Sequence, residues 1–225
     1  MSTCSEIREI LHGRKFKYSV EKYPFKKILE KTFGVPLEDI HKWVGTFNSF
    51  TKYTDQNTIV HKVFYANFAL NFKEIYEDFI INEVAKFVPE DFFYQQIPTF
   101  RIGLPGNKFV GEFHKDLSYN HQDYELNFNV GLSNYLGQAS LKTEEKPNSN
   151  KFIYLECPYG ETFCFDHINC MHGSEENLSD QTMVSFDFRL ALEKFYFESN
   201  AESIGMNTKF NKGYYFSSNI IKSIN

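Results

Sequence analysis

The spacing of hydrophobic and polar positions changes near residue 94 of the chain. Before that point apolar residues recur every three to four positions, which is the period of an amphipathic α-helix. Asn71 is a candidate N-cap for the clearest such segment, 71–88, and Pro89 follows its end. The apolar side chains of this segment fall near one stripe at Phe72, Ile75, Tyr76, Phe79, Ile80 and Phe87.

A second helical pattern lies between residues 23 and 34. Its last residue, Gly34, suits the left-handed turn that often ends a helix. Pro36 then stands at a favourable first position for a further helix. Residues 1–93 are therefore expected to form a mostly helical layer.

From residue 94 onward, short aromatic or β-branched runs alternate with Gly, Pro and Asn, as in strands separated by turns. A polar segment, 142–150, is expected to be a loop between strands. The pattern predicts an α+β chain with a mainly β core, a β-sandwich or jelly-roll barrel over 94–200 that the N-terminal helices buttress. Residues 201–225 would be a C-terminal extension, and 1–225 a single domain. The strand-like runs are 93–105, 109–117, 124–132, 151–157, 161–167 and 182–197.

Composition and charge narrow the class of function. The 25 Phe and 14 Tyr supply much apolar area for a β-rich core. The net charge is −5 and no basic stretch interleaves with aromatics, so nucleic acid is not an expected partner. The chain has no signal-peptide core, no apolar run of about 18 residues, and no CxxC among its four cysteines. We therefore expect a reduced cytoplasmic protein without a membrane partner or a structural zinc knuckle.

Candidate metal chemistry begins with the stretch FHKDL, residues 113–117. If this stretch is a strand, His114 and Asp116 project to one side, because successive side chains of a strand point to opposite faces. Two such side chains can bind one metal ion, and the chain must then supply a third ligand.

His172 is the best candidate for the third ligand. It lies between the strand-like runs 161–167 and 182–197, where a turn would present it at the mouth of a barrel. His167 is the alternative, although a structural role suits it better. Two imidazoles and one carboxylate form the facial triad of non-haem Fe(II) oxygenases, whereas zinc prefers four ligands and has no redox chemistry.

The run VSFDFRL, residues 184–190, adds a candidate anion site. Its alternation places Ser185, Asp187 and Arg189 on one face. An arginine that points into an apolar barrel is costly to bury unless it meets an anion, and its planar guanidinium suits a carboxylate. The far carboxylate of 2-oxoglutarate would be such an anion, and the Ser185 hydroxyl could bind it as well.

Taken in order, H114-x-D116, His172 and Arg189 resemble the HxD…H…R signature of Fe(II)/2-oxoglutarate-dependent dioxygenases. More narrowly, IPTFRIGLPGNKFVGEFHKDLSYNHQDYELNFNVGLS and HGSEENLSDQTMVSFDFRL resemble hydroxylases of the streptomycin-biosynthesis (StrG) type. The close match covers about residues 94–192. The segment NVGL and Ser174 depart from the pattern of these relatives, and both lie away from the metal ligands.

The resemblance implies a double-stranded β-helix, a cupin-like jelly roll. It also implies His114, Asp116 and His172 as iron ligands and Arg189 as the anchor of the co-substrate 2-oxoglutarate. With Fe(II) and O₂, such an enzyme would hydroxylate a small polar biosynthetic substrate and convert 2-oxoglutarate to succinate and CO₂. A free amino acid, an amino-sugar, a cyclitol or a related natural-product intermediate would suit. Desaturation or cyclisation would use the same ligands. A monomer or a homodimer is expected.

Two other functions use the same residues. One is a cupin-like binding or isomerase domain in which His114 acts as an acid–base residue without a redox metal. The other is a zinc-dependent hydrolase that uses the same three ligands.

Four further residues are candidates around the site. Asn127 lies on the same strand face as two other polar residues, and an interior amide there would need a partner such as the co-substrate. Arg101, Tyr119 and His121 are candidates for contact with substrate. A surface ion pair for Arg101, and an ordinary polar loop for Tyr119 and His121, are the alternatives.

Overall fold

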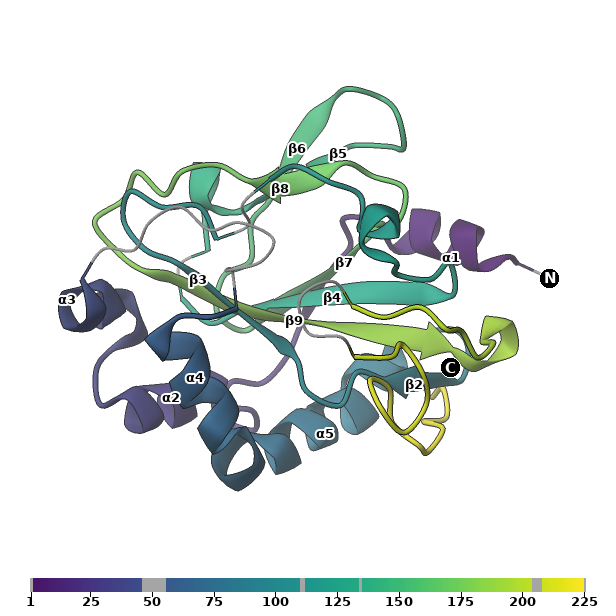
Figure 1. Ribbon diagram of the computed structural model, residues 1–225, viewed down its shortest axis with the longest axis horizontal. Coiled ribbons are helices and arrows are strands. Elements are labelled where there is room, and N and C mark those ends of the chain that lie inside the picture. The colour runs from purple at the N-terminus through teal and green to yellow at the C-terminus, as the bar shows by residue number, and fades with distance from the viewer. Residues whose placement is uncertain (1, 46–55, 110–111, 134, 204–207, 225) are drawn as a thin grey trace.

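Two antiparallel sheets form the centre of the computed structural model, which describes residues 2–45, 56–109, 112–133, 135–203 and 208–224 (Figure 1). Within these residues the larger sheet has the strand order β1-β7-β4-β9-β2, with β3 also paired to β9. Its strands are β1 (Lys15–Lys17), β2 (Phe92–Tyr94), β3 (Thr99–Gly103), β4 (Glu125–Gly131), β7 (Glu161–Phe165) and β9 (Met183–Leu192). The smaller sheet has the order β6-β5-β8, with β5 (Leu141–Glu144), β6 (Phe152–Leu155) and β8 (His172–Ser174).

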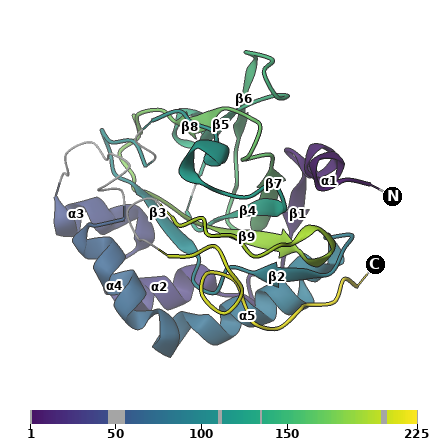
Figure 2. The ribbon, with the colours of Figure 1, turned by 45° about the vertical axis from the view of Figure 1, so that its right-hand side comes forward.

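The helices precede most of the strands in the sequence. Helices α2, α4 and α5 lie along one face of the larger sheet, and the smaller sheet lies over its other face (Figures 1 and 2). The α-helices are α1 (Cys4–Leu11), α2 (Phe25–Phe33), α3 (Ile40–Val44), α4 (Ile59–Asn67) and α5 (Lys73–Asn82), and a π-helical segment, Phe68–Phe72, joins the last two. Short 3₁₀ helices cover Leu37–Asp39, Val84–Lys86, Asp116–Tyr119, Gly137–Ala139 and Glu193–Phe195.

The two faces of the larger sheet differ in chemistry because side chains alternate along each strand. On β9, the rings of Phe186 and Phe188 pack against the helices, where Phe186 lies 5.2 Å from Phe25 and Phe188 lies 5.7 Å from Tyr76 between ring centroids. The alternate residues face the smaller sheet and are polar: Ser185, Asp187 and Arg189 on β9, and Glu125, Asn127 and Asn129 on β4. The aromatic core thus lies on the helical side, and the polar residues lie between the sheets.

The N-terminal helices confirm part of the sequence pattern and correct another part. Helix α2 ends as expected at Gly34, whose φ is 74°. Asn71 is not an N-cap, because α4 continues through the π-helical segment into α5 without a break. A π-helical turn contains one extra residue, which rotates the apolar stripe of α5 relative to that of α4. Both helices can therefore keep their apolar sides on the sheet.

The strand predictions were confirmed for most of the β core, with two corrections. The segment 142–150 is not a loop throughout, since β5 occupies its first residues and places Leu141 and Thr143 on one face. The stretch 113–117 is not a strand: His114 makes one isolated bridge, and Asp116 begins a 3₁₀ helix. The mainly β core with antiparallel sheets agrees with the prediction.

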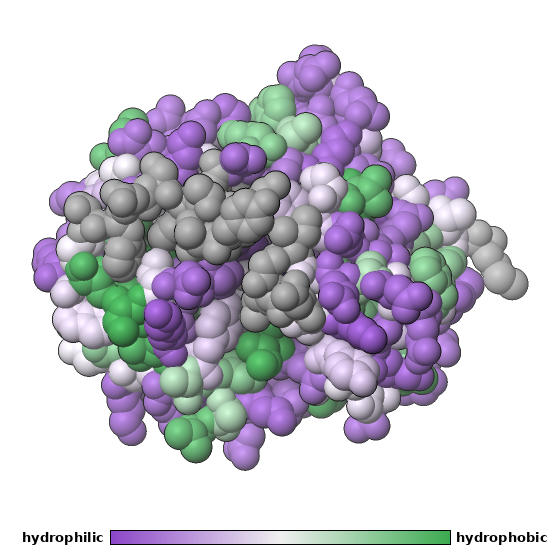
Figure 3. Space-filling model, in the orientation of Figure 1, coloured by the Kyte–Doolittle hydropathy of each residue, from purple (hydrophilic) through white to green (hydrophobic). Residues whose placement is uncertain are grey.

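The face seen in Figure 3 is mainly hydrophilic, with hydrophobic side chains in small separate groups, several of which lie on the helical side. Among the described residues, no helix has the length and apolar character needed to cross a membrane.

Candidate metal centre and its pocket

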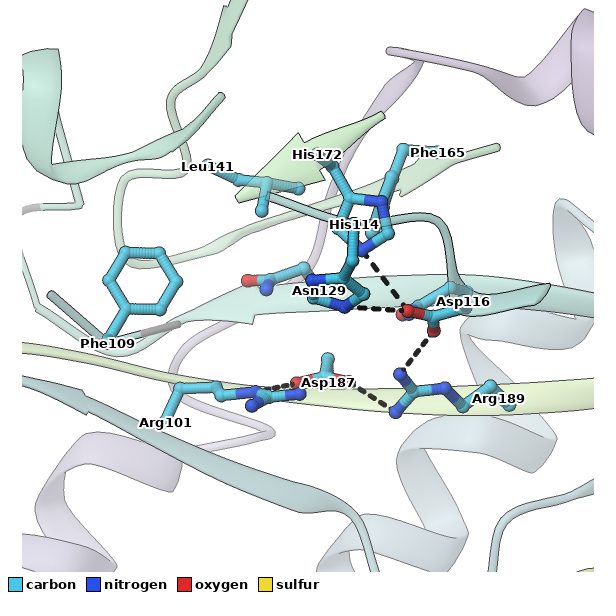
Figure 4. Close-up of a pocket in the computed structure, with 11 residues that line it drawn as sticks. Arg101, Phe109, His114, Asp116, Asn129, Leu141, Phe165, His172, Asp187 and Arg189 are labelled. Atoms are coloured by element: carbon cyan, nitrogen blue, oxygen red, sulfur yellow. Dashed lines mark hydrogen bonds and ion pairs between the residues drawn. The ribbon is translucent and has the colours of Figure 1, made fainter. Parts of the chain in front are cut away.

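His114, Asp116 and His172 meet between the two sheets (Figure 4). Nε2 of His114 lies 3.1 Å from Oδ1 of Asp116, and Nε2 of His172 lies 3.3 Å from the same oxygen. One possible ligand atom from each residue lies within 4.8 Å of the others. Neighbouring ligands on a metal ion with bonds of about 2.1 Å are roughly 3–3.5 Å apart, so the two histidine-to-aspartate separations have this spacing and the three residues could hold one ion.

The backbone brings these side chains together from distant parts of the sequence. His114 and His172 form an antiparallel bridge in which each N–H donates to the carbonyl of the other at 2.9 Å. The N–H of Asp116 donates to the carbonyl of His167 at 2.8 Å, and the 3₁₀ helix that follows turns the chain back. The bridge and the turn place the side chains of His114 and Asp116 on one side, as expected, but without a strand.

Backbone carbonyls fix the tautomer of both imidazoles. Nδ1 of His114 donates to the carbonyl of Glu112 at 2.7 Å, and Nδ1 of His172 donates to the carbonyl of Cys170 at 3.0 Å. A neutral ring held in this way carries its lone pair on Nε2, the atom that faces Asp116. Two lone pairs and a carboxylate oxygen directed at one point repel each other unless a cation lies between them. The donor set therefore fits a divalent metal ion.

Asp116 is held in its charged form although its carboxyl group is buried. Nη2 of Arg189 donates to Oδ2 of Asp116 at 2.8 Å. Burial alone would raise the pKa of Asp116, but the Arg189 charge, together with His114 and His172, holds it well below its ordinary value. Arg189 engages Oδ2, so Oδ1 is the oxygen that faces the two imidazoles.

Asp187, on β9, accepts hydrogen bonds from two arginines of the site. Its Oδ2 accepts from Nη1 of Arg189 at 2.6 Å, and its Oδ1 accepts from Nε of Arg101 at 2.7 Å. Burial would raise the pKa of Asp187, but Arg101 and Arg189 lower it. Arg101 thus lines the pocket and pairs with the buried Asp187, not with a surface carboxylate.

The metal-binding group opens onto a pocket of about 330 Å³. Its polar walls are Arg101, His114, Asp116, Asn127, Asn129, His172, Asp187 and Arg189, and its apolar walls are Phe109, Leu141 and Phe165. The residues come from both sheets, so the pocket lies between them (Figure 4). Its mixture of apolar walls with a few polar groups suits a small ligand.

Several buried polar atoms at this site have no hydrogen-bond partner among the described residues. They are Oδ1 of Asn127, Oδ1 of Asn129, Oγ of Ser185 and Nε of Arg189. A buried polar atom without a partner costs free energy, and such atoms are normally satisfied by protein, water or a ligand. The placement of Asn127 agrees with the predicted interior position, and its role as a cofactor contact stays a prediction.

Glu125, His121 and His167 form a second buried polar cluster next to Asp116. Oε2 of Glu125 accepts from Nδ1 of His121 at 2.7 Å and lies 3.8 Å from Nε2 of His167. Nε2 of His121 is 4.0 Å from Oδ2 of Asp116. Burial opposes ionisation of Glu125, yet His121 and His167 lower its pKa to about 2. His167 therefore faces Glu125 and is not part of the metal-binding group.

Tyr119 lies beside the metal-binding group, where its ring packs on His114 with centroids 4.5 Å apart. Tyr119 and His121 are close to the ligands, but neither lines the described pocket. Their predicted contact with substrate remains a prediction.

Arg8 is a structural residue that sequence patterns did not single out. Its guanidinium is fully buried, forms an ion pair with Asp123 and donates to Asp166 at 3.2 Å and to the carbonyl of Glu125 at 3.3 Å. Asp166 follows β7 and also accepts from the N–H of Asn169 at 3.1 Å. Arg8 thus ties the start of β4 to the turn that leads to His172. The sequence offers one cue, an arginine on the apolar side of a short helix.

Known proteins resemble the chain in sequence and in fold. No protein-family model matches it. The streptomycin biosynthesis protein StrG of Streptomyces griseus is 28% identical over 202 residues, which cover 90% of this chain and 96% of that protein. The chain is therefore similar to StrG over most of the length of both proteins. The resemblance predicted from residues 94–192 is therefore confirmed, and the similarity extends over most of the N-terminal layer.

Solved structures share the fold at low sequence identity. The non-haem monooxygenase ThoJ in its apo form has a TM-score of 0.51 and 11% identity, and the match covers 96% of this chain and 86% of ThoJ. EctD from S. alaskensis, solved with 2-oxoglutarate and 5-hydroxyectoine, has a TM-score of 0.51 and 14% identity, with 88% and 78% coverage. The chain thus shares its fold with ThoJ and EctD.

Proposed function

We propose that this chain is an Fe(II)- and 2-oxoglutarate-dependent oxygenase that hydroxylates a small polar substrate. The observation that carries the proposal is the convergence of Nε2 of His114, Nε2 of His172 and Oδ1 of Asp116 beside two arginines. The relationship to StrG, and the presence of 2-oxoglutarate in the EctD structure, support it. In this proposal the two sheets are the halves of a double-stranded β-helix within a single domain.

The charges that line the pocket favour a dianionic co-substrate. Two arginines, Arg101 and Arg189, balance two carboxylates, Asp116 and Asp187, and the other lining residues are neutral when the imidazoles are. A divalent metal ion would raise the charge of the lining to +2. 2-Oxoglutarate carries two negative charges, so it neutralises the loaded site, whereas a neutral ligand leaves two buried positive charges uncompensated.

Each residue then has a defined task. Fe(II), when bound by His114, Asp116 and His172, supplies the redox chemistry with O₂ and chelates the keto acid. Arg189 holds Oδ2 of Asp116, so that Asp116 would offer only Oδ1 to the metal ion. Phe165 and Leu141 form apolar walls that exclude water from the bound keto acid.

Succinate formation tests the proposal. Protein loaded anaerobically with Fe(II) should, on addition of O₂, convert 2-oxoglutarate slowly to succinate, and faster with the right substrate. A screen of amino acids, amino-sugars and cyclitols should reveal a product that gains one oxygen atom for each succinate formed. His172→Ala should lower the rate at least about 100-fold, and His41→Ala, outside the pocket, should not change it. Turnover that is independent of O₂ would favour the zinc hydrolase or the cupin-like isomerase.

A further inference from the structure

The two arginines of the pocket occupy different places relative to the metal-binding group. Arg189 donates to Asp116 through Nη2 at 2.8 Å and to Asp187 through Nη1 at 2.6 Å. Arg101 donates to the other oxygen of Asp187 at 2.7 Å. Arg189 is therefore adjacent to a metal ligand, and Arg101 lies on the far side of Asp187, at the end of the pocket near Phe109 (Figure 4).

The length of 2-oxoglutarate favours the more distant arginine. A keto acid that chelates a metal uses its first carboxylate and its keto oxygen, and its far carboxylate follows two methylene groups later. The first and last carbons of an extended five-carbon chain are about 5 Å apart. Arg189 shares its carboxylate partner with the metal, so it lies close to the chelated end. Arg101 is separated from Asp116 by both Asp187 and Arg189, which leaves room for the intervening chain.

The register of strands β3 and β9 shows which polar side chains lie beside Arg101. Ser185 lies opposite Arg101 in the pairing of β3 with β9, so their side chains are neighbours on the same face. Ser185 and Arg189 are four residues apart on one strand, which separates their Cα atoms by about 13 Å. A single carboxylate between Ser185 and Arg101 is therefore easier to place than one between Ser185 and Arg189.

Tyr135 adds a third polar group at this end. The hydroxyl of Tyr135 and Oγ of Ser185 are both buried, and among the described residues neither has a hydrogen-bond partner outside this pair. The pKa of Tyr135 is raised well above its ordinary value by burial and by Cys157, and Arg101 acts to lower it. The ring of Tyr135 packs on Phe109, a wall of the pocket, with centroids 5.4 Å apart. Ser185 also lowers the pKa of Tyr135 through a hydrogen bond, so two buried hydroxyls lie close to each other and near a guanidinium, which is a suitable set for a carboxylate.

We infer that Arg101, with Ser185 and Tyr135, anchors the far carboxylate of 2-oxoglutarate, while Arg189 holds Asp116 in place for the metal. This inference rests on the proposed function. It gives Arg101 the role that the sequence suggested for Arg189, and it keeps Ser185 in that role.

Keto-acid binding without turnover tests the inference. The protein is loaded with Ni(II), and calorimetry measures its affinity for 2-oxoglutarate and for 2-oxopentanoate, which has the same carbon chain without the far carboxylate. Wild-type protein should prefer 2-oxoglutarate about 10–100-fold, because charge-assisted hydrogen bonds to the far carboxylate are lost with 2-oxopentanoate. Arg101→Gln, which retains an N–H for Asp187, should reduce this preference to within about threefold.

Matched variants identify the anchor. The Arg189→Gln variant should still prefer 2-oxoglutarate over 2-oxopentanoate about tenfold or more, even if it binds Ni(II) more weakly. The variants Ser185→Ala and Tyr135→Phe should each lose part of this preference. Arg101→Lys keeps the charge and should keep part of the preference, and circular dichroism checks that each variant is folded. A full preference in folded Arg101→Gln protein, or its loss in Arg189→Gln protein alone, would overturn the assignment.

Failure of the underlying function gives a different result. If Ni(II)-loaded wild-type protein binds neither keto acid, the site is not one for 2-oxoglutarate, and the anchor assignment is overturned together with the proposed function. If wild-type protein prefers 2-oxoglutarate over 2-oxopentanoate and only the Arg189→Gln variant loses this preference, the proposed function stands and only the anchor assignment is wrong.

Discussion

Nη2 of Arg189 lies 2.8 Å from Oδ2 of Asp116, and the two side chains are only 6% and 3% exposed. This ion pair connects strand β9 of the larger sheet to the metal-binding group. Removal of one partner leaves the other charge buried without compensation, which is more damaging than loss of an exposed pair. The pair therefore determines how Asp116 is presented to a metal ion.

Arg189→Gln is expected to weaken metal binding. Groups that orient a metal ligand typically contribute about 10–100-fold in affinity, and Arg189 fixes the oxygen of Asp116 that does not face the imidazoles. Calorimetric titration with Ni(II) measures the effect. Arg101→Gln is the control, because Arg101 lines the same pocket but hydrogen-bonds to Asp187 and not to Asp116. This variant should change the Ni(II) affinity by less than about threefold. Equal affinity in wild-type and Arg189→Gln protein would show that the ion pair does not support the metal centre.

Arg8→Ala is expected to lower the free energy of unfolding by roughly 3–5 kcal/mol, because it leaves Asp166 buried without its cation. Urea unfolding measures this change. Lys17→Ala is the control, since Lys17 is 85% exposed and lies 4.0 Å from Glu161, and its loss should cost at most about 0.5 kcal/mol. Similar costs for the two variants would rule out the role assigned to the buried arginine.

Gly131→Ala is expected to destabilise the fold at the end of β4. A Cβ atom at Gly131 would lie 1.9 Å from the carbonyl oxygen of Cys157, a backbone atom that cannot move alone. The cost should be about 2 kcal/mol or more. At Gly103 the nearest atom would be in the Phe109 side chain at 3.3 Å, so Gly103→Ala should cost less. Thermal melting of both variants checks the order, and the reverse order would contradict the close approach at Gly131.

The stability of the metal-free protein is expected to fall in acid partly through Glu125. The pKa of this group is lowered from 4.5 to about 2 in the folded state, so its contribution is present above about pH 4.5 and is lost as the pH falls towards 2. Glu125→Gln removes this titration. The free energy of unfolding of the variant should therefore decrease less between pH 5 and pH 3 than that of wild-type protein, as urea unfolding at both pH values measures. Parallel pH profiles would contradict the lowered pKa.

The sequence predicted the polar face of the β core better than its helices. The alternation of Ser185, Asp187 and Arg189 follows from strand geometry alone and appears in the structure as predicted. Asn71 was misassigned because one extra residue in a π-helical turn leaves the apolar period almost unchanged on either side. Residues 142–144 were read as a loop because the short strand β5 carries Lys142 and Glu144 in a polar context.

The candidate site depends on contacts that no local pattern encodes. The sequence predicted His114, Asp116 and His172 as one group, and the structure brings the three residues together. The bridge between His114 and His172 joins residues 58 positions apart and replaces the expected strand. The partners of the arginines could not be predicted either. Asp187 lies between Arg101 and Arg189 only because β3 pairs with β9 in one particular register.

The most direct measurement of the central claim is the visible absorption of anaerobic protein with Fe(II) and 2-oxoglutarate. Chelation of the keto acid by iron held on His114, Asp116 and His172 predicts a weak charge-transfer band that requires both components. The band should be absent in His172→Ala protein and present in His41→Ala protein. No band with wild-type protein, or an unchanged band in His172→Ala protein, would contradict the assignment of the metal centre.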